Sequence, residues 1–232
     1  MLEQEKIKEL SQFFGNKQKK VFTKLLKSPL IFELSASIDN EFFIASIPQN
    51  KTLMVASATA KEGKTTLSIL LACLAALANP HKKILLIDSN FRKNGFNEAI
   101  KLKKDAPGLY EVLLDKATYD EATQTTMIPN LFVMTSKREK TVPKEMILEP
   151  FAYFMKKIKQ EYDFTIIDSA STDKYSPSIG KIIENVLLVI SYGEPQYEQI
   201  RVMVNGFNEA EANILGVVIN KRKFVLPKIL YG

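Results

Sequence analysis

The sequence has few of the residues that build disulfide frameworks and zinc sites. Cys73 is its one cysteine and His81 its one histidine. A single cysteine cannot form a disulfide framework, and one cysteine with one histidine supplies too few soft ligands for a zinc site. We therefore expect a protein of a reducing compartment that is held together by its hydrophobic core.

Long hydrophobic runs are missing too. The longest mostly apolar run, Leu67 to Ala78, is shorter than the roughly 18 residues that a membrane-spanning helix needs, and no signal peptide opens the chain. With 46% apolar residues among 232, the chain can bury a full core, and this length favours one large domain. We expect the protein to be soluble by itself and cytoplasmic.

Arginine is scarce, so lysine carries almost all of the net charge of +6. The arginines are Arg92, Arg138, Arg201 and Arg222. Basic proteins bind nucleic acid or anionic lipid, but a solvated lysine-rich surface is the commoner meaning of a modest positive charge. We do not expect a nucleic-acid partner.

The sequence is organised around Leu53 to Ala78, which read LMVASATAKEGKTTLSILLACLAALA. The apolar start predicts a buried strand, residues 57–63 predict a turn, and Lys64 onward keeps a helical pattern that Asn79-Pro80 closes. Between strand and helix, residues 58–65 fit the P-loop pattern G-x-x-x-x-G-K-[ST], except that Ala58 replaces the first glycine.

The chemistry of nucleotide binding accounts for each part of this loop. Backbone N–H groups surround the phosphates, Gly63 allows close approach, Lys64 reaches the β- and γ-phosphates, and the Thr65 hydroxyl ligates Mg²⁺. The alternative is a chance G-K-T before a core helix, but the flanking strand and helix favour a nucleotide site. We expect these residues to line it: Ala58, Thr59, Ala60, Lys61, Glu62, Gly63, Lys64, Thr65 and Thr66.

Two further apolar runs each end in an aspartate. Residues 84–88 and 164–168 predict buried parallel strands that deliver Asp88 and Asp168 to the ligand-bearing edge of a sheet. Either aspartate alone could be a helix N-cap or a turn residue, but the repeated construction beside a P-loop favours one site. We expect Lys64, Asp88 and Asp168 to be catalytic, and Thr65, Asp88 and Asp168 to hold Mg²⁺.

The alternation of apolar runs with helical patterns predicts an α/β fold with a doubly wound, mostly parallel sheet. Further strands are expected at 130–135, 186–190 and 214–219, and further helices at 95–102, 109–116, 144–162 and 196–213. Pro150 is a candidate for a kink in the third of these helices.

The first 48 residues precede the first strand and predict helices interrupted at Ser28-Pro29. Lysines interleave with apolar residues there, so we expect the segment to cover one side of the sheet with its lysines in water. Contact with a membrane surface or a partner is the alternative. The expected division is an N-terminal helical segment for docking or oligomerisation at 1–48 and a P-loop ATPase/kinase-like domain at 49–232.

In order along the chain, several segments resemble the bacterial tyrosine kinases, the cytoplasmic ATPases that accompany capsule and exopolysaccharide co-polymerases. Asp88 follows Lys64 by 24 positions in ILLIDSNFRK, which resembles that family's second acidic motif. The other segments are PGLYEVLLDKATYDEA, PNLFVMTS, YDFTIIDSAS, ENVLLVISYGEPQ and ILGVVINK, and the resemblance covers about Glu33 to Lys221.

The resemblance implies a P-loop NTPase of the Walker A/A′/B type that binds ATP or ADP with Mg²⁺. It implies that Asn220 contacts adenine, whereas without the family a strand-end turn asparagine is an equal alternative. It also implies a partner, the cytoplasmic segment of a membrane polysaccharide co-polymerase, and a location at the inner face of the membrane through that partner.

Some residues depart from the family's pattern around the loop. Lys61 stands where the family has glycine, and we expect its side chain to point to solvent. Asn90 replaces a second acid that would help position metal or substrate hydroxyl. Thr59 occupies the place of the signature lysine of ParA- and MinD-like ATPases, which argues against that branch. Ser169-Ala170-Ser171 replaces Thr-Pro-Pro.

Other departures concern phosphorylation and assembly. The family's tail has several clustered tyrosines, whereas this chain ends LPKILYG with Tyr231 alone. Glu33, Ala36 and Asp39 align with the family's ring-forming E-x-x-R-x-x-R, so both arginines are missing. A methyl or a carboxylate cannot replace a bidentate guanidinium, and we do not expect a ring through this motif, although another homo-oligomer stays open.

Together these features predict a protein that binds ATP and Mg²⁺ and has weak or lost kinase activity, because phosphoryl transfer depends on positioning and charge neutralisation. Two alternatives from other classes stay open. One is a nucleotide-switched positioning ATPase of the ParA/MinD type, and the other is a non-catalytic scaffold in which the P-loop only holds the fold.

Overall fold

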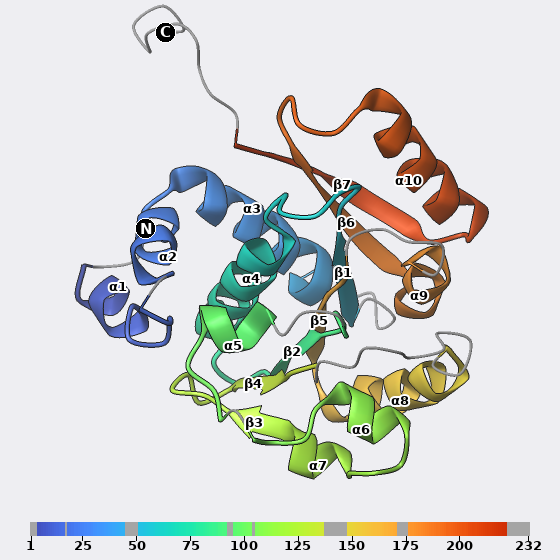
Figure 1. Cartoon of the computed structure of the whole chain (residues 1–232). Helices are drawn as coiled ribbons and strands as arrows, with labels where there is room; N and C mark the ends of the chain where they lie inside the picture. The colour runs from blue at the N-terminus through green and yellow to red at the C-terminus, as the bar shows by residue number, and fades with distance from the viewer. Residues whose placement is uncertain are drawn as a thin grey trace, which may run out of the picture.

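A seven-stranded sheet forms the centre of the computed structural model, which describes residues 4–16, 18–44, 51–91, 95–103, 105–136, 148–170 and 176–221 (Figure 1). The strand order is β3-β4-β2-β5-β1-β6-β7, and only β3 runs antiparallel to its neighbour. The strands are β1 (Thr52–Ala56), β2 (Ile84–Asp88), β3 (Thr123–Thr125), β4 (Leu131–Met134), β5 (Phe164–Asp168), β6 (Asn185–Ser191) and β7 (Asn213–Asn220).

Helices cover both faces of this sheet. One face carries α1 (Gln4–Leu10), α2 (Lys19–Leu25), α3 (Pro29–Asp39), the π-helix η1 (Asn40–Ile44), α4 (Lys64–Ala78) and α5 (Gly95–Ala99). The other carries α6 (Leu109–Leu113), α7 (Tyr119–Ala122), α8 (Leu148–Glu161), α9 (Ser176–Ile183) and α10 (Tyr197–Glu209). Among the described residues, no helix is long and apolar enough to cross a bilayer.

The central strands are buried on both faces. Every residue of β1, β2 and β5 is buried, as expected for parallel strands with helices on either side. Their carboxyl ends lie together at one edge, because β5 pairs in parallel with both β1 and β2. The doubly wound, mostly parallel fold predicted from the sequence is confirmed, and this edge is where ligands bind in such sheets.

The N-terminal helices pack onto the sheet as predicted. Phe14 and Phe22 stack with ring centroids 4.2 Å apart, and both belong to the same buried cluster as strand residues of the sheet. The backbone of Phe14 forms an antiparallel β-bridge with Ile100. The ring centroids of Phe42 and of Phe164 on β5 lie 4.6 Å apart. The proposed boundary at residue 48 remains a prediction, as does a docking or oligomerisation role.

Several predicted helix bounds were wrong. The helix predicted at 109–116 ends at Leu113, and Asp115 beyond it has a left-handed backbone with φ 54°. The helix predicted at 95–102 ends at Ala99. Pro150 is the third residue of the described α8, and proline is tolerated in a first turn. Residues 144–147 and 45–50 lie outside the described residues.

We predict that Phe22→Ala lowers the free energy of unfolding by about 3–5 kcal/mol, because it leaves a cavity against the ring of Phe14. The neighbouring Val21, which is 47% exposed, is the matched control, and Val21→Ala should change stability by less than about 0.5 kcal/mol. Urea unfolding measures both. Similar small effects for the two variants would show that the N-terminal helices are not part of the core.

Candidate nucleotide site

The P-loop connects β1 to α4 and needs a glycine just before the helix. Gly63 has φ 104°, a left-handed conformation that side chains rarely adopt. A Cβ atom built there would lie 2.3 Å from Nδ2 of Asn220, which is closer than any real contact. Gly63 therefore lets the end of β7 approach the loop, and it starts α4 at Lys64 as predicted.

Lys64 is a buried cation inside the loop. Its side chain is 8% exposed, and its Nζ donates to Oγ of Ser57 at 2.6 Å and to the carbonyl of Thr59 at 3.4 Å. Burial lowers the pKa of Lys64, while the charges of Asp168 and Glu62 oppose that shift. Ser57 and Thr59 thus hold the ammonium at the start of the loop. Ser57 had not been predicted from the sequence.

Asp168 and Thr65 are in direct contact. The Thr65 hydroxyl donates to Oδ2 of Asp168 at 2.6 Å, and Ser68 donates to Oδ1 at 3.4 Å. Burial raises the pKa of Asp168 to about 6, and the Thr65 hydrogen bond and the charge of Lys64 hold it lower than burial alone would. The structure brings together the residues predicted to bind metal, whose roles remain predictions.

Asp88 lies beside Asp168 in the register of β2 and β5. Its Oδ1 accepts from the backbone N–H of Asn90 at 2.9 Å, and its Oδ2 is buried without a hydrogen-bond partner among the described residues. Burial and the charge of Asp168 raise the pKa of Asp88 well above its usual range. Two buried carboxylates, one with an unpartnered oxygen, fit a divalent cation, because Mg²⁺ binds through one or two carboxylates and phosphate oxygens.

Glu62 braces the loop against the sheet. It is fully buried, its Oε2 accepts from the backbone N–H of Thr59 at 2.9 Å, and its Oε1 accepts from the backbone N–H of Ser191 at 3.1 Å. The carboxylate thereby ties the loop to the end of β6. Sequence reasoning had placed Glu62 in the phosphate site without finding this role.

Asn220 reaches the same loop from the end of β7. Its Nδ2 donates to the carbonyl of Glu62 at 2.7 Å, and its Oδ1 accepts from the backbone N–H of Lys221 at 2.8 Å. An amide has two donor hydrogens and an acceptor oxygen with two lone pairs, so one donor hydrogen and one lone pair of Asn220 remain for a further hydrogen bond. The adenine contact stays a prediction.

The outer part of the loop is open to solvent. Ala60 and Lys61 are exposed, and Ala58, Thr59 and Thr66 are half-buried. Exposure of Lys61 agrees with the expected solvent-facing side chain. Its backbone has φ 66°, and its carbonyl accepts from Nζ of Lys221, which also pairs with Glu194 at 3.0 Å.

The site follows the order of strand, phosphate loop and helix. It carries a buried lysine, a threonine hydroxyl and two carboxylates at strand ends. This combination defines a P-loop nucleotide-binding protein. The family described as AAA domain matches residues 50–193, more than half of the chain. The tyrosine-protein kinase YwqD of Bacillus subtilis (strain 168) is 30% identical over 181 residues, which cover 75% of this chain and 74% of YwqD. The chain belongs to the bacterial tyrosine-kinase family.

Two more similarities agree with this assignment. The crystal structure of the chimerical protein CapA2B2 superposes with a TM-score of 0.73 and 27% identity, over 85% of this chain and 87% of that one. The succinoglycan biosynthesis transport protein ExoP of Rhizobium meliloti (strain 1021) is 23% identical over 184 residues, 75% of this chain but 22% of ExoP. The resemblance found in the motifs is confirmed.

We predict that Lys61→Gly raises the free energy of unfolding by about 1 kcal/mol, because glycine relieves the cost of a left-handed backbone. Ala60→Gly is the matched control, since Ala60 has no positive φ and should lose about 0.5–1 kcal/mol. Urea unfolding without nucleotide compares the two. A loss of stability in Lys61→Gly would contradict the left-handed assignment.

The second prediction from this site concerns pH. Asp168 has a pKa of about 6 in place of the usual 3.8, so the folded protein binds the extra proton and loses stability as the pH rises between these values. The Asp168→Asn substitution removes this loss. We therefore predict that the difference in the free energy of unfolding, variant minus unsubstituted protein, is on the order of 2–3 kcal/mol larger at about pH 7.5 than at about pH 4.

Urea unfolding without Mg²⁺ or nucleotide measures this difference. Asp163 precedes the same strand and pairs with Lys82 at 3.4 Å near the surface, so Asp163→Asn is the control and should show no such gain. An Asp168→Asn effect that is equal at both pH values would mean that the carboxylate is not destabilised by burial.

Proposed function

We propose that this protein binds ATP with Mg²⁺ at the P-loop and that nucleotide binding, more than phosphoryl transfer, is its main activity. The observation that carries the proposal is the buried group formed by Lys64 at the start of α4 with Asp88 and Asp168 at the carboxyl ends of β2 and β5. The Lys64 ammonium interacts with Asp168, both carboxylates have raised pKa values, and a bound divalent cation would favour their ionised forms.

Each residue has a proposed role in this site. Lys64 would neutralise the β- and γ-phosphates, and Thr65 and Asp168 would hold Mg²⁺, Asp168 through water. Asp88 would accept the proton of a tyrosine hydroxyl or of water, and Asn220 would contact adenine. Mg²⁺ supplies neutralisation of charge on the phosphate oxygens.

Several features support a low rate of phosphoryl transfer. Asn90 contributes no charge beside Asp88, and its backbone N–H is bonded to that carboxylate. Asp39, at a position of the family's ring motif, accepts from Nδ2 of Asn79 at 3.1 Å within the same chain. Tyr231 lies outside the described residues, so its part in transfer stays a prediction. Fewer positioned charges should slow transfer more than binding.

We propose that the partner is the cytoplasmic segment of a membrane polysaccharide co-polymerase, which would hold this protein at the inner face of the membrane. Membership of the tyrosine-kinase family and the similarity to ExoP, a succinoglycan biosynthesis transport protein, support this partner. They also favour it over a ParA/MinD-type positioning ATPase.

We predict that saturating ATP with Mg²⁺ stabilises the protein, by about 2.7 kcal/mol at a hundred times the dissociation constant, and that Lys64→Ala abolishes the effect. Lys83→Ala is the matched control, because Lys83 is exposed at the start of β2, away from the loop. Thermal unfolding with and without nucleotide measures both. An unchanged ATP response in Lys64→Ala would overturn the site.

Labelled ATP, with and without the partner's cytoplasmic peptide, then distinguishes the activities. We expect binding with little label on Tyr231 and little free phosphate. Abundant tyrosine label would mean an efficient kinase, and abundant phosphate alone would mean an ATPase. Absence of binding would leave the scaffold role and overturn the proposal.

A further inference from the structure

The positive charge of this protein is concentrated in one stretch. Residues 10–32 contain five lysines and no aspartate or glutamate, so they hold +5 of the net +6, and the rest of the chain is almost neutral with 27 basic and 26 acidic residues. A solvated surface that only keeps a protein in solution mixes charges of both signs. The bias indicates a local function.

Three of the described lysines lie on one side of α2 and of the turn that follows it. Lys20 and Lys24 are spaced i and i+4 on α2, about 40° apart around the helix and opposite Phe22, and Lys27 follows in the turn in which its backbone N–H donates to the carbonyl of Lys24 at 3.2 Å. Phe22 is 1% exposed and stacks on Phe14, which fixes the rotation of the helix. The three lysines therefore point away from the core and cannot turn toward it.

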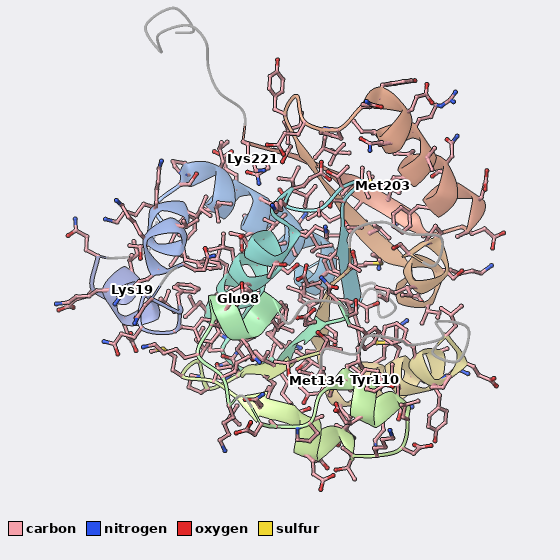
Figure 2. All side chains as sticks on the ribbon, viewed as in Figure 1. Lys19, Glu98, Tyr110, Met134, Met203 and Lys221 are labelled. Atoms are coloured by element: carbon pink, nitrogen blue, oxygen red, sulfur yellow. The ribbon has the colours of Figure 1, made fainter. Side chains whose placement is uncertain are left out.

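No described carboxylate neutralises this surface. Lys19, Lys20, Lys24 and Lys27 are exposed, and none makes an ion pair with a described residue. Figure 2 shows Lys19 at the start of α2, on the side of the molecule away from α10.

Exposed apolar side chains accompany the lysines. Val21 is 47% exposed on α2, and Leu30, three residues after Lys27, is 71% exposed. Three residues of chain span about 10 Å at most, so Leu30 lies close to the lysines. Lysines beside exposed aliphatic groups suit a bilayer surface, where the charges meet anionic headgroups and the aliphatic groups enter the interface. Nucleic acid would not require the apolar groups.

We propose that the α2 surface, formed by Lys20, Lys24 and Lys27 with Val21 and Leu30, binds the anionic surface of a lipid bilayer directly. Each lysine contributes roughly a fivefold preference for anionic over neutral lipid, so three lysines provide about a hundredfold preference. Binding of this strength is weak by itself. Beside a membrane partner it acts as a second anchor, and this last point alone rests on the proposed function.

Sedimentation of the whole protein with vesicles tests the proposal without nucleotide or partner, so its result is independent of the ATP site. We expect binding to vesicles of equimolar phosphatidylglycerol and phosphatidylcholine, little binding to phosphatidylcholine alone, and weaker binding at high salt. The variant Lys20→Gln/Lys24→Gln/Lys27→Gln should lose roughly a hundredfold in binding and keep its unfolding temperature.

The matched control removes three exposed lysines elsewhere, as Lys83→Gln/Lys116→Gln/Lys156→Gln, and should bind like the unsubstituted protein. An equal loss in the control would reduce the effect to net charge and overturn the proposal. So would absence of binding to anionic vesicles. Displacement from the vesicles by a DNA duplex at equal phosphate concentration would make α2 a polyanion site and would also overturn it.

Discussion

Asp88 and Asp168 are a pair of buried carboxylates of which Asp168 alone interacts with the buried ammonium of Lys64, and the arrangement of the site depends on that imbalance. Asp88 and Asp168 end neighbouring strands in register, so the β2–β5 ladder holds their backbones side by side. Burial makes their charged forms costly, and Lys64 compensates only in part. A site built in this way favours a ligand that brings positive charge among the carboxylates and negative charge to the lysine.

The phosphate loop beside these carboxylates is held in place by strands that are distant in sequence. Glu62 ties it to β6 through Ser191, and Asn220 ties it to β7 through the Glu62 carbonyl. Because the bracing groups are buried or bonded to backbone, the loop has its shape before any ligand binds. Preorganised donors cost less to use on binding, which favours nucleotide binding.

Much of this could be predicted from the sequence, for physical reasons. Residues 84–88, 164–168 and 64–78 were predicted with their exact bounds, because continuous apolar runs end sharply at charged, glycine or proline positions. The three-residue β3 was not predicted because it is too short to show a period, and α9 was missed although its apolar residues lie on one face. The convergence of Lys64, Asp88 and Asp168 follows from parallel strands, whereas the Glu62 brace joins residues 129 positions apart and no local pattern indicates it.

The most direct test of the account is the proton release that accompanies binding of ADP with excess Mg²⁺. Calorimetry at about pH 6, in two buffers of different ionisation enthalpy, should show release of roughly half a proton from Asp168, with any proton from Asp88 in addition. This follows because a bound cation ionises carboxylates whose pKa values burial has raised. Binding heats that are identical in the two buffers would contradict the claim that the site is an unbalanced pair of buried carboxylates awaiting a cation.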